Sequence, residues 1–161
     1  MDMGCFALDM VSTRIDRILE LRICSLDMER VTGRGNPDAY AMKIHSKDNE
    51  SITYRGLSYK PFFYYDSDGI VSITFIFTDI INCPDTLESI NRYNQKSDGI
   101  FSLAIDRRSR LVLQRETRFG KNGMEIDVAD ELAFAAKAFK NEADSISELI
   151  KELKKQNKTI E

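Results

Sequence analysis

The 161-residue sequence predicts a single α+β domain, with a mainly antiparallel sheet and helices packed on one face of it. Two observations predict this class. Segments in which apolar and polar residues alternate are separated by short turn sequences, which is typical of antiparallel strands. Longer segments with an apolar residue at every third or fourth position lie between and beyond them, which is typical of helices that cover a sheet. The expected order is helix, three strands, helix, two strands, helix.

The first predicted element is a helix from Leu8 to Val31, whose apolar residues recur at helical spacing. Gly33 to Asp38, which include two glycines and a proline, end it. The exact end of the helix is ambiguous, because Leu19, Leu21 and Ile23 also alternate as they would in a strand.

Three strands are expected next. Ala39 to His45 is the first, and Ser51 to Tyr65, interrupted by a glycine, counts as the second. The third, Val71 to Thr78, follows a turn at Asp66 to Gly69, where the Asp-Gly pair supplies the positive φ that a hairpin needs. Ile76 breaks the polar side of this third strand, so we expect it to be central and partly covered on both faces.

The second half of the chain is expected to be a helix, a hairpin and a long helix. Pro84 opens the helix, and the hairpin has its tip at Asp106 to Ser109. An apolar stripe from Val128 to Leu153 predicts a final helix of roughly 40 Å at about 1.5 Å per residue. This is longer than one core needs, so we expect the surplus to reach solvent or a second subunit. We expect residues 156–161 to fray, which leaves a domain of residues 1–155.

Composition narrows the class of protein. The net charge is −3 and the sequence pI is near 5.3, which argues against nucleic acid as a partner. No stretch reaches the roughly 20 apolar residues that cross a bilayer, and the first residues lack the pattern of a signal peptide. The three cysteines, Cys5, Cys24 and Cys83, are too widely spaced to indicate a disulfide framework, so we expect reduced thiols and a cytoplasmic protein.

The sequence patterns that indicate catalysis are missing. There is no GxSxG elbow, no phosphate-binding loop and no dinucleotide fingerprint. His45 is the single histidine, and it has no close cysteine partner that would predict a metal site. We therefore expect a protein that binds a partner, with no enzymatic activity, no cofactor and no metal.

An aromatic run is the first candidate for partner binding. Tyr59, Phe62 and Tyr64 belong to a segment with five aromatic residues within seven positions. Because a strand alternates its faces, such a run places rings on both sides of the sheet. One set packs under a helix, and the other is either core or a surface for a peptide or protein. Pro61 within the run favours an edge strand.

An arginine-rich hairpin is the second candidate. Arg107 and Arg108 lie at its tip, and Arg110, Arg115 and Arg118 follow, so that the five fall within twelve residues. These side chains could hold a phosphate or an acidic peptide. The alternative, which we favour, is that they protect a sheet edge from aggregation.

The order of elements at this length resembles the type III secretion chaperone-like fold, and within it the YbjN family of bacterial sensory-transduction regulators. The segments that carry the resemblance are Ile90 to Asn94, Gly99 to Asp106 and the closing amphipathic helix. The resemblance implies a small, non-enzymatic, dimeric protein that holds a partner protein or peptide. The arginine-rich hairpin and the mildly acidic pI depart from a typical secretion chaperone, which favours a regulatory adaptor.

Overall fold

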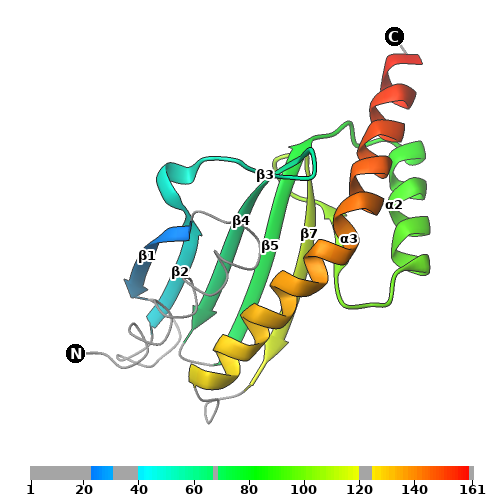
Figure 1. The fold of residues 1–161 in the computed structure, drawn as a ribbon. Helices are drawn as coiled ribbons and strands as arrows, with labels where there is room; N and C mark the ends of the chain where they lie inside the picture. Colours follow the sequence, from blue (N-terminus) through cyan, green and yellow to red (C-terminus); the bar gives the residue numbers. More distant parts are fainter. Residues whose placement is uncertain (1–22, 31–39, 67–68, 120–124, 160–161) are drawn as a thin grey trace.

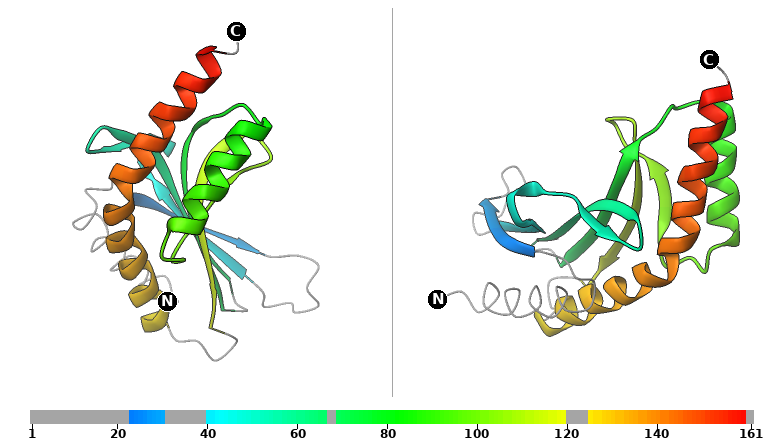
Figure 2. Two further views of the ribbon diagram at one scale, coloured as in Figure 1. Left: turned by 90° about the vertical axis from the view of Figure 1, so that its right-hand side faces the viewer. Right: turned by 45° about the horizontal axis from the view of Figure 1, so that its top comes forward.

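The structure, a computed structural model, describes residues 23–30, 40–66, 69–119 and 125–159. These residues form one open sheet of antiparallel strands with two helices packed on one face (Figures 1 and 2). The predicted α+β class and the single, mainly antiparallel sheet are therefore confirmed. The strand order is β1-β2-β4-β5-β7-β6, and β3 pairs separately with β4.

The elements have the following bounds. The strands are β1 (Ile23–Arg30), β2 (Tyr40–Ser46), β3 (Ile52–Tyr54), β4 (Leu57–Asp66), β5 (Ile70–Asp79), β6 (Ser102–Ile105) and β7 (Arg110–Arg118). A short 3-10 helix, η1 (Lys47–Asn49), follows β2, and the α-helices are α2 (Pro84–Lys96) and α3 (Glu125–Thr159). The third predicted strand, the second helix and the hairpin are found where the sequence places them.

The predicted helix from Leu8 to Val31 is wrong over Ile23–Arg30, which form strand β1. Residues up to 22 lie outside the described residues. Strand β1 pairs with β2, with Leu26 opposite Ile44 and Met28 opposite Met42. The spacing of apolar residues fits a helix and a strand equally well over so short a segment, and pairing with β2 decides between them.

The predicted interrupted strand from Ser51 to Tyr65 is two strands, β3 and β4, that form a tight hairpin. Tyr54 pairs with Leu57 on either side of a two-residue turn. Both turn residues have positive φ, 49° at Arg55 and 81° at Gly56, as a type I′ hairpin turn requires. The glycine therefore reverses the chain.

Pro61 does not make β4 an edge strand, because β4 pairs with β5 on one side and with β3 and β2 on the other. The edge position predicted from this residue is wrong. The proline lies between the β3 ladder, which ends at Tyr59, and the β2 ladder, which begins at Phe62. A residue without a backbone N–H is tolerated where the ladder on one side is interrupted.

An aromatic cluster joins the sheet to helix α3. Phe75 of β5 stacks on Phe139 of α3 with ring centroids 4.0 Å apart, and Tyr59 of β4 lies 4.7 Å from the same ring. Phe63 and Phe101 meet Phe75 edge to face. All five side chains are buried, and such ring pairs add roughly 0.5–1.5 kcal/mol each to the gain from burial.

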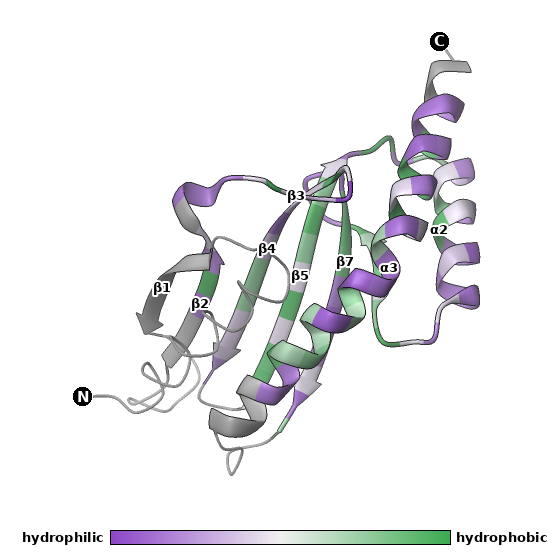
Figure 3. Ribbon diagram, in the orientation of Figure 1, coloured by the Kyte–Doolittle hydropathy of each residue, from purple (hydrophilic) through white to green (hydrophobic). Residues whose placement is uncertain are grey.

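Helix α3 is long because it packs on two parts of the molecule in turn. Buried alanines let its first half approach the sheet closely, and they are Ala135, Ala136, Ala138 and Ala143. Beyond them Ile146, Leu149 and Leu153 remain buried where α3 passes α2 (Figure 1). Figure 3 shows hydrophobic and hydrophilic residues in alternating bands around α3. The apolar surplus expected to reach solvent is thus used inside the chain, and α3 continues past the predicted boundary at 155 to Thr159.

Helix α2 closes the edge of the sheet at β6. The Asn94 side chain donates to the Leu103 carbonyl (2.9 Å) and accepts from the Leu103 N–H (2.8 Å). Its amide therefore replaces a neighbouring strand at the centre of β6, where an open edge would otherwise invite pairing with another chain. Both residues belong to segments that carry the resemblance described above, so these segments have a structural role.

Candidate functional site

The aromatic run divides between the two faces of the sheet. Tyr59, with 1% of its surface exposed, and Phe63, with 2%, face α3 and belong to the core. Phe62 and Tyr64 alternate with them and are half-buried on the opposite side, which we call the outer face. Of the three aromatic residues predicted to bind a partner, the structure brings Phe62 and Tyr64 together and places Tyr59 on the other side.

An apolar band crosses the outer face. Phe62 lies beside Thr74 of β5, and the next row contains Ile76 of β5 and Val112 of β7. Val112 is 3% exposed, whereas Phe62 and Ile76 are half-buried. Helices α2 and α3 pack on the other side of the sheet, so among the described helices none covers this band (Figure 2).

The band has a polar border on the same face. Lys60 of β4 pairs with Ile76 and so borders the band on one side. On the other side of Phe62, Ser72 of β5 pairs with Tyr64 of β4 and with Glu116 of β7. The Tyr64 hydroxyl donates to the carboxylate of Asp66 (3.2 Å), which is buried at the turn into β5. An apolar centre with a polar rim is the usual anatomy of a protein interface.

The arginine-rich hairpin does not form one basic surface. Arg110 is paired with Asp106 at 2.8 Å within the turn. Arg115 points to the α3 side, where it pairs with Glu131 and donates to the Ile100 carbonyl. Strand β7 lies between β5 and β6, so the prediction that the arginines protect a peripheral strand does not hold for β7 as a whole.

Arg107 and Arg108 remain exposed at the tip of the hairpin. Their neighbour Asp106 organises the turn by accepting from the backbone N–H groups of Arg108 and Arg110. Burial would raise the pKa of the Asp106 carboxyl, but these hydrogen bonds and the Arg110 guanidinium together lower it. The carboxylate that balances Arg110 is therefore charged at neutral pH.

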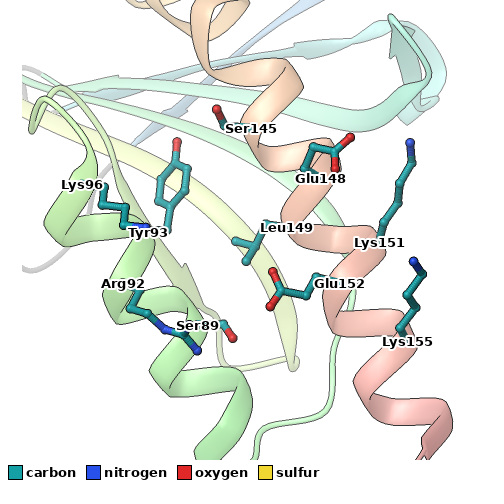
Figure 4. Close-up of a pocket in the computed structure, with 10 residues that line it drawn as sticks. All are labelled: Ser89, Arg92, Tyr93, Lys96, Ser145, Glu148, Leu149, Lys151, Glu152 and Lys155. Atoms are coloured by element: carbon teal, nitrogen blue, oxygen red, sulfur yellow. The ribbon is translucent and has the colours of Figure 1, made fainter.

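A groove between α2 and α3 is a site that the sequence patterns did not predict (Figure 4). Its volume is about 520 Å³, within the range of roughly 300–1,000 Å³ typical of small-molecule sites. Ser89, Arg92, Tyr93 and Lys96 line it from α2, and Ser145, Glu148, Leu149, Lys151, Glu152 and Lys155 line it from α3. The α2 residues recur at helical spacing, which was a usable signal, but sequence spacing does not say which helix they face.

A partly buried pair of side chains lies at one end of the groove. The Tyr93 hydroxyl donates to the carboxylate of Glu142 in a short hydrogen bond. Burial, with added effects from Glu142, raises the pKa of Tyr93 well above its usual value, so the phenol stays protonated. Tyr93 and Glu142 thus bind each other and hold the two helices together at this point.

The Ser89 hydroxyl is the unusual group of the groove. Ser89 is 4% exposed, and its oxygen has no hydrogen-bond partner among the described residues. An unsatisfied buried hydroxyl costs roughly 1–3 kcal/mol, so such groups are uncommon and need an explanation.

Within the described residues, no group of three or more histidine, cysteine, aspartate or glutamate side chains is arranged to hold a metal ion. No helix in the described part of the chain is long and apolar enough to span a membrane. The Nδ1 atom of His45, the single histidine, lies 3.0 Å from the Ser46 carbonyl oxygen.

Comparisons with protein-family models, with characterised proteins and with solved structures found no match to this chain.

Proposed function

We propose that this chain is a non-enzymatic protein-binding adaptor or regulator, of the YbjN or secretion-chaperone type, which acts in the cytoplasm. It holds a partner protein or peptide on the outer face of the sheet. The observation that supports this proposal is the pair of half-buried apolar side chains Phe62 and Ile76, which lie beside the buried Val112 on the face opposite the described helices. A partner would gain about 25 cal/mol for each Å² of apolar surface that it covers there.

The proposal includes a homodimer, as the resemblance implies. The length of helix α3 does not support the homodimer, because the apolar stripe of this helix is buried within the chain up to Leu153. Light scattering of the purified protein at micromolar concentration tests this part. A mass twice that of the chain is expected, and a monomer would contradict the dimer without affecting the partner surface.

A dedicated secretion chaperone or an immunity-type partner of one cognate protein is the alternative within the same class. It uses the same outer face and differs in the stoichiometry and strength of binding. A binder of phosphate or nucleotide at the arginine-rich hairpin is a further alternative. It has less support, because Arg110 and Arg115 are already paired with carboxylates and only Arg107 and Arg108 are exposed at the tip.

Affinity purification from the native host, followed by mass spectrometry, tests the proposal. The tagged wild-type chain is compared with Phe62→Ser/Ile76→Ser and with Arg107→Ala/Arg108→Ala, after circular dichroism has shown that all three fold. We expect a stoichiometric partner that is lost with the first variant and retained with the second. Loss with the arginine variant alone would favour the anion-binding alternative, and recovery of no partner with the wild type would overturn the proposal.

A further inference from the structure

The groove between α2 and α3 separates charges of opposite sign. Lys151 and Lys155 belong to the α3 wall but extend to the side of α3 away from α2 (Figure 4). Arg92 and Lys96 line the groove from α2, and Glu148 and Glu152 line it from α3. None of these four side chains makes an ion pair or a hydrogen bond with another described residue. Oppositely charged side chains that face each other without pairing leave both charges available to a ligand between them.

Buried groups lie at the floor of the groove, beneath the charged side chains. The Ser89 hydroxyl has no partner in the described structure, and Leu149 is 8% exposed. Figure 4 shows Ser89 and Arg92 on one wall and Glu152 reaching toward them from the other. Ser89 precedes Arg92 by three positions on α2, so both project from the same face of the helix. A hydroxyl beside a guanidinium is suited to bind one anionic group.

We propose that this groove binds a dipolar organic ligand, with an anionic group at Ser89, Arg92 and Lys96 and an ammonium or guanidinium group at Glu148 and Glu152. The part of the ligand between its charges would lie on Leu149. An amino acid or a short peptide has this chemistry. A simple anion would contact Arg92 and Lys96 but would leave Glu148 and Glu152 without a partner, and the test below distinguishes it from a dipolar ligand.

The site is independent of the proposed partner surface, which lies on the outer face of the sheet. Substitutions of Phe62 and Ile76 should leave it unchanged, so the two proposals fail or succeed separately.

A series of ω-amino carboxylates, from 3-aminopropanoate to 8-aminooctanoate, tests the proposal, because it measures the distance between the two charged walls. Binding to the full chain is followed by calorimetry and by amide chemical shifts of α2 and α3. We expect one chain length to bind best. The matching carboxylate without the amine, and the matching amine without the carboxylate, should each bind at least about tenfold more weakly, since each loses a charge-assisted contact.

Variants locate the site. Arg92→Gln and Glu152→Gln should each weaken binding of the best probe by about tenfold, and Ser89→Ala by several-fold. Arg107→Gln and Glu116→Gln make the same charge changes away from the groove and should have no effect.

Two results would overturn the proposal. One is that no member of the series binds. The other is that inorganic phosphate binds as well as the best probe and binds more tightly to Glu152→Gln, which would indicate a site for anions alone.

Discussion

The two faces of strand β4 carry the same kind of residue in different surroundings. Phe63 is 2% exposed and meets Phe75 on the α3 side, whereas its neighbour Phe62 is half-buried beside Thr74 on the outer face. Both are phenylalanines in one unbroken strand, so neither residue type nor local propensity separates them. What separates them is the layer that each face meets, and this assigns one ring to stability and the other to the proposed partner surface.

The largest expected effect concerns the covered face. Phe75→Ala removes a fully buried ring that contacts Tyr59, Phe63, Phe101 and Phe139. It should lower the free energy of unfolding by about 3–5 kcal/mol, because it combines lost burial with a cavity. Urea denaturation measures this. The matched change on the outer face, Phe62→Ala, should cost below about 1 kcal/mol, and equal losses would show that the outer face is also core.

Two arginine–glutamate pairs of β7 extend the comparison to charges. On the α3 side, Glu131 accepts from Arg115 at 2.5 Å and from Thr117 at 2.7 Å, and its side chain is 10% exposed. Glu131→Gln should therefore destabilise the protein by about 2 kcal/mol, since it weakens charge-assisted bonds in a nearly buried place. On the outer face Glu116 lies 3.9 Å from Arg118 and both are exposed.

The control Glu116→Gln should change the unfolding free energy by less than about 0.5 kcal/mol. Chemical denaturation at low and at moderate salt measures both variants. If the two losses were alike, the difference between the faces would not extend to their ion pairs.

The edge of the sheet at β6 extends the comparison from the two faces to a boundary of the sheet, which Asn94 closes. Asn94→Ala should destabilise the protein by about 1–2 kcal/mol, because it removes both hydrogen bonds to Leu103. The amide of Leu103 should also exchange faster with solvent hydrogen, which a general loss of packing would not confine to that residue. Asn91→Ala, on the exposed side of α2, is the control and should change neither quantity.

The smallest expected effect lies at the hairpin tip, which belongs to neither face. The pKa of Asp106 is lower in the folded chain than in the unfolded one, so its contribution is present at neutral pH and is lost as the pH falls below about 4. Because the pair with Arg110 is partly exposed, this contribution should stay below about 1 kcal/mol. When the free energy of unfolding is measured against pH, Asp106→Asn should reduce the loss of stability at acid pH slightly more than Asp79→Asn does. Identical profiles for the two variants would contradict this account.

Periodicity predicted much of the fold. The alternation from Val71 to Thr78 predicted β5, and the stripe from Val128 to Leu153 predicted the side of α3 that is buried from Leu132 onward. It failed over Ile23–Arg30, because a short segment with few apolar residues matches both periods. It also missed the turn at Arg55, because an arginine at positive φ is not a residue type that indicates a turn.

The candidate sites were less predictable than the fold. Alternation required that aromatic rings of the run lie on both faces, but it did not say that Tyr59 would be core and Phe62 outer. The groove depends on Arg92 and Glu152, which are far apart in the sequence and line the same groove only because α3 passes α2.

The sequence by itself determined the local elements, since the spacing of apolar residues sets which side of a helix or strand must be buried. It also determined that the aromatic run from Tyr59 would be divided between two faces. Only the tertiary structure decided which face α3 covers, which arginines meet carboxylates and which helices enclose a groove. These depend on contacts between residues far apart in the chain, where packing and electrostatic energies outweigh local preference.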